Sequence, residues 1–260
     1  MPALVEMLSG AEVLEDGFAL AITPDWQQGR TAYGGLTSAL AVEAARRVLP
    51  EPLPLRSAQF SMISPLVGRI EARAKIVRAG RNAVWVTAEL VGEKGTGFLA
   101  NCVFMHPRES VLALGGYALP DGLVPLEDAP VFETKVLPAF MQMHFDVRVA
   151  VPADRLQEAD LCWWVRVRER EGLDADVEAV LLGDALPPAV LPHLPPRTPV
   201  SSMQWHVNML NTAARPRDGW WLIRSTSRQS GHGLASEDIL QWGEGGTPAV
   251  AGMQSVAVFA

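Results

Sequence analysis

Three polar residues in the second half of the chain, Asp184, Ser202 and Gln254, are of types that can activate a water molecule. A carboxylate such as Asp184 accepts a proton from water or orients it, as a general base does. A hydroxyl and an amide, here Ser202 and Gln254, can hold the same water from the other side without acting as nucleophiles. We therefore take these three residues as the candidate catalytic set.

An oxyanion formed by such an attack needs hydrogen-bond donors. The N–H groups at the start of a helix suit this role because they form the positive end of the helix dipole. Gly34 and Gly35 follow Tyr33 at a predicted helix start and carry no side chain that would block an approach. We expect Tyr33, Gly34 and Gly35 to bind substrate, and the sequence leaves open whether they serve the same site as Asp184.

The elements that would position these residues follow one plan, which occurs twice. In the first copy a strand at 18–22 precedes a helix at 34–49, whose last turn carries Arg46 and Arg47. Alternating apolar residues and glycine turns then predict four strands, at 57–63, 69–77, 83–91 and 97–105. One helix followed by long antiparallel strands indicates a curved sheet wrapped around a helix.

The second copy follows a segment, 107–138, that is richer in Gly, Pro and Asp and is predicted to be a linker. A second helix is expected at 174–186, stopped by Pro187 and Pro188. Strands are predicted on both sides of it, at 141–149, 161–167, 202–210, 220–224, 234–241 and 249–259. Because only this copy carries the Asp–Ser–Gln set, we expect one catalytic site per chain, located where the two repeats meet.

Composition limits the class of protein. The chain has 260 residues, 48% of them hydrophobic and 20% charged, which predicts a substantial core. Its net charge of -7 argues against a nucleic-acid partner, because such surfaces are normally basic. Cys102 and Cys162 lie in apolar stretches and are expected to be buried free thiols. Neither a secretion signal nor an apolar run of about 18 residues is visible, so we expect a cytoplasmic protein without a membrane span.

The sequence offers no sign of a cofactor. Its five histidines are scattered without metal-ligand spacing, and neither a dinucleotide fingerprint nor a phosphate loop is visible. The serines also lack the Gly-x-Ser-x-Gly elbow of serine hydrolases. We therefore expect no metal and no cofactor.

Ala32-Tyr33-Gly34-Gly35, followed by one long helix and two closing strands, resembles the entry to the central helix of a hotdog domain. The tandem copy resembles the double-hotdog acyl-CoA thioesterases of the thioesterase II type over nearly the whole chain. The resemblance implies an α+β fold with an N-terminal hotdog at 1–107, a linker at 108–138 and a C-terminal hotdog at 139–260. It further implies hydrolysis of acyl-CoA to a free acid and CoA, and we expect a homo-oligomer.

The same family places an Asp near the end of the second helix, a Thr at the start of the next strand and a Gln in the final strand. These positions resemble Asp184, Ser202 and Gln254, with Ser in place of the usual Thr. Ser201 is an alternative, one residue out of register. Ser202 is preferred because it alternates with Gln204, His206 and Asn208, which leaves Met203, Trp205 and Val207 on the apolar face.

Two other functions stay open at the level of sequence. A non-catalytic acyl-CoA-binding protein could keep the fold, and the Ser at the Thr position is compatible with that role. A hotdog hydratase or dehydratase would need a catalytic Asp and His pair in a hydratase motif, which is not found. Taken singly, Asp184, Ser202 and Gln254 could each be structural, and Gly34 and Gly35 could serve close packing of helix on sheet.

Overall fold

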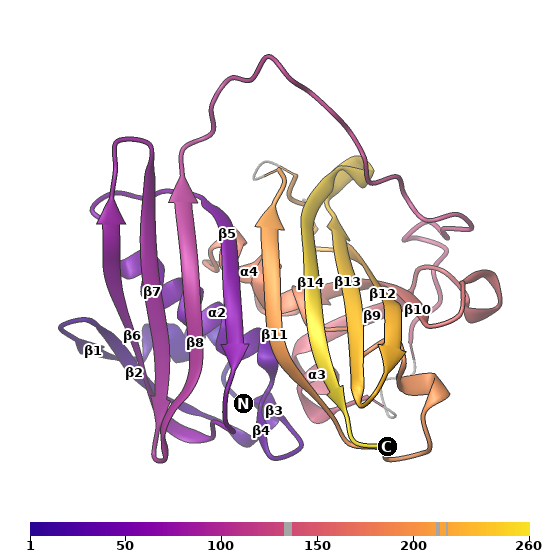
Figure 1. Cartoon of the computed structure of the whole chain (residues 1–260), viewed down its shortest axis with the longest axis horizontal. Coiled ribbons are helices and arrows are strands. Elements are labelled where there is room, and N and C mark those ends of the chain that lie inside the picture. Colours follow the sequence, from indigo (N-terminus) through magenta and orange to yellow (C-terminus); the bar gives the residue numbers. More distant parts are fainter. Residues whose placement is uncertain (133–136, 212–213, 217) are drawn as a thin grey trace.

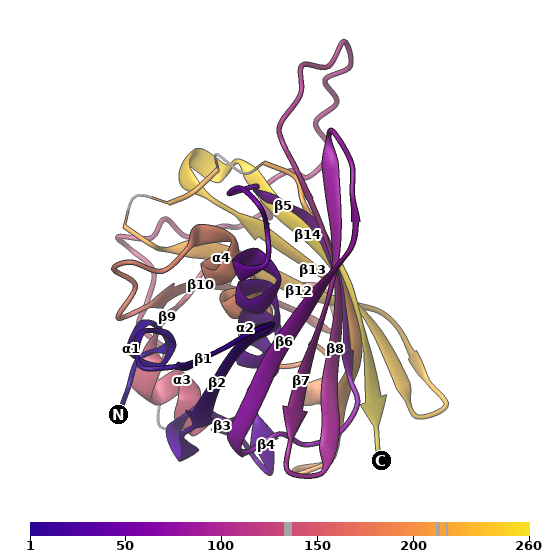
Figure 2. The same ribbon diagram turned by 90° about the vertical axis from the view of Figure 1, so that its left-hand side faces the viewer.

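The dominant feature of the computed structural model is a single antiparallel sheet, which curves around two central helices (Figures 1 and 2). Residues 1–132, 137–211, 214–216 and 218–260 are described. In this part of the chain the sheet has twelve strands in the order β1-β2-β6-β7-β8-β5-β11-β14-β13-β12-β10-β9. The fold is a double hotdog, as the sequence predicts.

The first half supplies one side of the sheet. After a short helix, α1 (Leu4–Ser9), the chain forms β1 (Glu12–Leu14), β2 (Gly17–Ile22), a 3-10 turn η1 (Pro24–Trp26), the small hairpin of β3 (Gln27–Gln28) and β4 (Thr31–Ala32), and the central helix α2 (Gly34–Arg47). Four longer strands follow: β5 (Leu55–Met62), β6 (Gly68–Ala79), β7 (Ala83–Gly92) and β8 (Gly95–Met105). Their alternating burial places one side of each strand on the helix.

The second half repeats this arrangement. It comprises α3 (Ala139–His144), β9 (Phe145–Val149), η3 (Ala153–Arg155), β10 (Asp160–Val167), the central helix α4 (Ala175–Gly183) and η4 (Leu191–His193). The closing strands are β11 (Val200–Met209), β12 (Trp221–Gly231), β13 (Leu234–Trp242) and β14 (Pro248–Val258), with η5 (Glu244–Gly246) before the last strand. The order β11-β14-β13-β12 matches the order β5-β8-β7-β6 of the first half.

The two halves join through an antiparallel pairing of β5 with β11, in which Phe60 lies opposite Trp205. The pairing removes two open sheet edges. On the inner face the helices α2 and α4 pack against each other (Figure 2). Nearly every residue of α4 is buried, including the acidic Asp176 and Glu178 in its first turn, and the rest of the helix is apolar.

One end of the helix pair is closed by charged residues. The last turn of α2 meets the first turn of α4, where Arg46 Nη2 lies 2.6 Å from Asp174 Oδ2 and Arg46 Nη1 lies 3.8 Å from Asp176 Oδ2. Arg215 also pairs with Asp176, and the backbone N–H of Leu55 donates to the same carboxylate. These contacts link the two helices at this end of the pair.

The segment after β8 crosses from one half to the other as an arch without helix or strand as far as an isolated bridge at Val131 (Figure 1). Its first part is exposed, including the apolar side chains of Val111, Leu112 and Leu114. Residues 133–136 of the predicted linker lie outside the described residues.

Several predicted elements need correction. The strand predicted at 141–149 is wrong in its first part, because residues Ala139–His144 form helix α3 and only Phe145–Val149 is a strand. Phe140 and Met141 are buried together with His144, three and four residues further on, which is helical spacing. A short apolar run in the sequence does not distinguish helix from strand. The strand predicted at 220–224 is much longer, Trp221–Gly231. Neither α1 nor β1 was predicted.

Cys102 and Cys162 are buried free thiols, as expected. Burial raises the pKa of each to about 12, so both stay protonated at neutral pH. No helix in the described part of the chain is long and apolar enough to cross a membrane.

Candidate active site

Asp184 caps the C-terminus of α4, at the end of the helix pair opposite the ion pairs of Arg46. Its carboxyl group is enclosed by protein on most sides and reaches a cavity. Burial raises the pKa of Asp184 to about 7, and the negative charge of Glu237 adds to the rise. The hydrogen bond from Gln254 and the nearby N–H of Gly35 act in the opposite direction. At neutral pH the group therefore exchanges protons readily, as a general base requires.

Gln254 is the direct partner of this carboxylate. Its Nε2 donates to Asp184 Oδ1 at 2.7 Å. The side chain is 3% exposed and extends from β14 toward the inner face of the sheet, where an unpaired amide would be costly. The hydrogen bond fixes the orientation of the carboxylate, so that Oδ1 is occupied and Oδ2 faces the start of α2.

The start of α2 adjoins the same carboxylate, which answers the question that the sequence left open. At Gly34 an added Cβ would lie 2.5 Å from Asp184 Oδ2, so any side chain here would displace the carboxylate. Gly35 contributes its backbone N–H on the same side. The N-terminus of one central helix thus meets the C-terminus of the other, with Asp184 between them.

Tyr33 has a different position from the one expected for a substrate-binding residue. Its ring is fully buried and stacks on Phe140 at 4.1 Å between ring centroids. Its hydroxyl donates to the carbonyl of Leu181 at 2.6 Å, and so links the start of α2 to the last turn of α4. Tyr33 and Gly35 are not among the residues that line the cavity, whereas Gly34 is.

A β-bulge brings Ser202 to the inner face. The register of β11 on β14 shifts at Met203, so that Ser202 lies opposite Val256 while Gln204 lies opposite Ser255. Residues that lie opposite each other in an antiparallel pair share a face, and so do residues two apart along a strand. Ser202 therefore shares the inner face with Val256 and Gln254.

The alternation predicted for this strand is wrong, because it counted through the bulge. Gln204, His206 and Asn208 are exposed on the outer face, and Ser202 does not belong with them. Met203, which was expected on the apolar face, is 39% exposed. Trp205 and Val207 are buried as expected. An extra residue in a strand reverses every face assignment beyond it.

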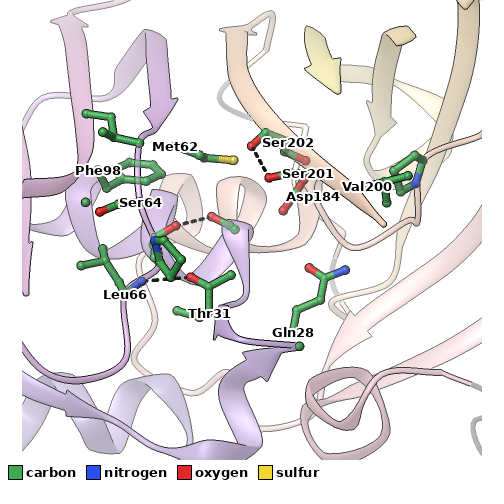
Figure 3. A pocket seen from close by; sticks show the side chains of 18 residues that line it. Gln28, Thr31, Met62, Ser64, Leu66, Phe98, Asp184, Val200, Ser201 and Ser202 are labelled. Carbon is green, nitrogen blue, oxygen red and sulfur yellow. Dashed lines mark hydrogen bonds between the residues drawn. The ribbon is translucent and has the colours of Figure 1, made fainter. Parts of the chain in front are cut away.

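Both serines lie close to Asp184 at the wall of the cavity, as Figure 3 shows. The Ser201 hydroxyl donates to the Ser202 carbonyl at 3.5 Å, a long contact. Within the described part of the chain, neither hydroxyl makes a hydrogen bond to the Asp184 carboxylate. Asp184 and the two serines thus line the cavity without a direct hydrogen bond between the carboxylate and either hydroxyl.

The cavity has a volume of about 360 Å³ and opens between the two halves of the chain. The first half contributes both apolar and polar side chains to the wall. The apolar ones include Met62, Ile63, Leu66 and Phe98, and the polar ones are Gln28, Thr31, Thr37 and Ser64. The second half contributes Asp184, Pro188, Val200, Ser201 and Ser202. Asp184 is the one acidic residue in this lining, which suits a substrate with an apolar part and a polar reacting group.

Most of the first-half lining was missed by the sequence analysis, since it comes from loops and strand ends without a motif. The β3–β4 hairpin supplies Gln28 and Thr31, and Thr31 Oγ1 accepts a hydrogen bond from the N–H of Leu66 at 3.0 Å (Figure 3). Glu237, which acts on Asp184 from β13, was missed as well. The signal that could have indicated it is a Glu that alternates with the apolar residues Ala235 and Ile239, and so falls on the buried face of the strand. The described residues hold no group of three or more His, Cys, Asp or Glu suited to a metal ion.

Comparisons with known proteins agree with this architecture. The model of the acyl-CoA thioesterase C-terminal domain matches residues 120–258, and that of the N-terminal domain matches residues 22–105. No curated protein sequence matches the chain.

Similar solved structures cover the whole molecule. A hot dog fold protein of unknown function from Alicyclobacillus acidocaldarius has a TM-score of 0.88 at 22% identity, covering 100% of this chain and 99% of that chain. Acyl-CoA thioesterase II TesB2 from Mycobacterium marinum has a TM-score of 0.79 at 19% identity and covers 98% of both chains. At these identities the likeness shows the fold, whereas the two domain matches show the family. The chain thus belongs to the acyl-CoA thioesterase family, with the N-terminal and C-terminal domains of that family joined in one polypeptide.

Proposed function

We propose that this protein hydrolyses acyl-CoA thioesters to a carboxylic acid and CoA, with Asp184, Ser202 and Gln254 positioning the attacking water. The observation that carries the proposal is the Asp184 carboxyl, which Gln254 holds at 2.7 Å where two helix ends meet beside the cavity. Its pKa of about 7 gives a base that is partly ionised at neutral pH.

In the proposed reaction Asp184 takes a proton from a water that the Ser202 hydroxyl also contacts. The water oxygen attacks the thioester carbon, and the carbonyl oxygen becomes an oxyanion. Backbone N–H groups at the start of α2, that of Gly34 foremost, stabilise this charge with the positive end of the helix dipole. The tetrahedral intermediate then expels the CoA sulfur, which leaves as the thiol after receiving the proton held by Asp184. Acyl-CoA and water thus yield the acid and CoA.

The substrate would lie across the cavity between the halves. The apolar wall of Met62, Leu66 and Phe98 suits an acyl chain, because burying apolar surface contributes about 25 cal/mol per Å². The polar groups near Asp184 suit the thioester. No metal or cofactor has a step in this scheme.

Thiol release from a panel of acyl-CoAs of different chain length tests the proposal. Hydrolysis of at least one of them, lost in the Asp184→Asn variant, is the expected result. Tight binding of acyl-CoA without thiol release would instead identify a non-catalytic binding protein. The same assay after exhaustive chelation should show unchanged rates, and activity restored only by one added metal would contradict direct attack of water.

A further inference from the structure

A second buried carboxyl lies behind the Asp184–Gln254 pair. Glu237 of β13 is 1% exposed and lies opposite Gln254 in the register of β13 on β14. It therefore occupies the inner face of the sheet, one strand away from the partner of Asp184. A Glu without charged neighbours is rarely buried to this extent, so the position calls for a physical reason.

The contacts of Glu237 are all with neutral groups. Its Oε2 accepts a hydrogen bond from the Ser225 hydroxyl at 2.9 Å. The backbone N–H groups of Ala189 and Val190 approach the carboxylate and favour its charged form, but Oε1 has no full hydrogen-bond partner among the described residues. Burial raises the pKa of Glu237 above its usual value. Within the described residues, the group is thus a buried acid without a cation in ion-pair contact.

These contacts reach the segment that carries the active site. Ala189 and Val190 end the stretch that begins at Asp184 and includes Pro188, a cavity-lining residue. Val190 also packs on Ala235 of β13 in a small apolar cluster. Glu237 consequently fixes the end of the same short segment whose start is Asp184.

Glu237 also acts on Asp184 through its charge. Among the titratable groups around Asp184, Glu237 is the one whose negative charge raises the pKa of the Asp184 carboxyl. The neighbouring groups on the other elements are Tyr33 of the α2 entry, which stays neutral because burial raises its pKa, and Gln254 and Ser202, which carry no charge.

We propose that Glu237 is a positioning residue for the hydrolysis: it anchors the 184–190 segment to β13 and supplies the negative environment in which Asp184 accepts its proton. The inference rests on the proposed function. It assigns Glu237 no contact with substrate, because the side chain is fully buried and does not line the cavity.

The test compares kcat/KM against pH for the wild type and Glu237→Gln on one acyl-CoA. Since like charge disfavours ionisation of a neighbouring carboxyl, removing it should move the acid limb of the profile to lower pH, by about half a unit or more. A matched control variant should keep that limb in place. Glu178→Gln removes another buried carboxylate, one that contacts Arg170 and Trp221. A folded Glu237→Gln variant with an unchanged acid limb would overturn the proposal.

A measurement without turnover separates this inference from the proposed function. In ¹³C-carboxyl NMR of the wild type, Asp184 and Glu237 should titrate as a coupled pair, each curve showing the other's step. Independent single-site curves would contradict the inference even if Glu237→Gln does not fold. If the wild type hydrolyses no acyl-CoA, the proposed function fails, while the coupled titration still decides whether Glu237 acts on Asp184.

Discussion

At the scale of residues, the proposed chemistry depends on a carboxyl group whose pKa lies near neutral pH. Asp184 meets this condition because burial and Glu237 disfavour its charge, while Gln254 donates at 2.7 Å and keeps it oriented. The arrangement has a thermodynamic cost, because the ionised form that accepts the proton is the form that the folded protein tolerates least. Activity and stability should therefore respond to pH in opposite directions.

Asp184→Asn should lower kcat by at least about a hundredfold, because an amide cannot accept the proton from water. In the wild type, kcat/KM should rise with pH as Asp184 loses its proton, with an acid limb near its pKa of about 7. Steady-state thiol release between pH 5 and 9, with circular dichroism as a fold control, measures both. Near-normal turnover in the variant would remove Asp184 from the mechanism.

The same substitution should stabilise the fold at alkaline pH. The pKa of Asp184 is raised from 3.8 to about 7, so the folded state binds a proton that the unfolded state releases. Stability from this group is full at acid pH and is lost as pH rises through about 7. At pH 8 the Asn variant should be more stable by roughly 2 kcal/mol, a figure reduced for the carboxyl's access to the cavity. Denaturant melts of both proteins at pH 5 and pH 8 test this, and a difference that does not change with pH would refute it.

The choice between Ser201 and Ser202 is a prediction that single substitutions can test. Ser202→Ala should lower kcat/KM by about two- to tenfold, the equivalent of one neutral hydrogen bond. Ser202→Thr should keep most of the activity because the hydroxyl remains, and Ser201→Ala should have little effect. Comparing the three variants on one acyl-CoA decides the question, because a large loss at Ser201 with none at Ser202 would exchange their roles.

At the scale of elements, the site is made by the meeting of two helix ends. The start of α2 and the end of α4 approach so closely that position 34 has no room for a side chain. Tyr33 stabilises the approach by donating to Leu181. The opposite ends of the same helices are held together by Arg46, Asp174 and Asp176. Helix packing thereby determines where the cavity forms.

Gly34→Ala should damage the site without removing any catalytic group. The added methyl would lie 2.5 Å from Asp184 Oδ2, so the carboxyl or the helix must move. We expect at least a tenfold loss of kcat/KM, in line with the sensitivity of catalysis to small displacements. Gly116→Ala, in the exposed crossing segment with open space around it, is the matched control. Wild-type kinetics in Gly34→Ala would contradict the prediction, because it would show that the two helix ends can move apart without loss of activity.

Sequence patterns predicted the elements of this fold better than the details of its site. Long strands such as β7 and β14 have alternation that survives in the structure, and the two helices appear near their expected positions. The bulge at Met203 has no composition signal, yet it determines which face Ser202 occupies. The lining residues Met62 and Phe98 lie opposite each other on β5 and β8 of the first half, but they share a cavity with Asp184 only when the halves pack, so no local pattern reports the site.

At the scale of the whole molecule, non-covalent contacts as well as the crossing segment hold the two halves together. They are joined by the β5–β11 pairing, by the packing of α2 on α4, and by a main core cluster that includes Phe60 and Trp205 from the two sides. We expect contacts of this kind to make the halves unfold as one unit. Homo-oligomer formation stays a prediction, which light scattering of the purified protein would test.

Cutting the crossing segment should therefore leave the enzyme assembled. Arg108 and Leu112 are exposed and lie in a stretch without helix or strand, the type of site that proteases prefer. After limited proteolysis there, the two fragments should migrate separately on a denaturing gel but elute together under native conditions, with most of the activity retained. Separation of the fragments in native buffer would show that the covalent connection is needed to hold the halves together.

The ion pairs of Arg46 with Asp174 and Asp176 have a consequence for symmetry. Two identical hotdog units packed in the same way would have to carry the same residues at both ends of the helix pair, so that every change improving one end would be imposed on the other. Joining the units in one chain removes this constraint. The Arg46 end is specialised for cohesion, while the Asp184 end keeps a buried acid that weakens the fold at high pH. A tandem chain can thus concentrate stability at one pole and reactivity at the other, which a symmetric pair cannot do.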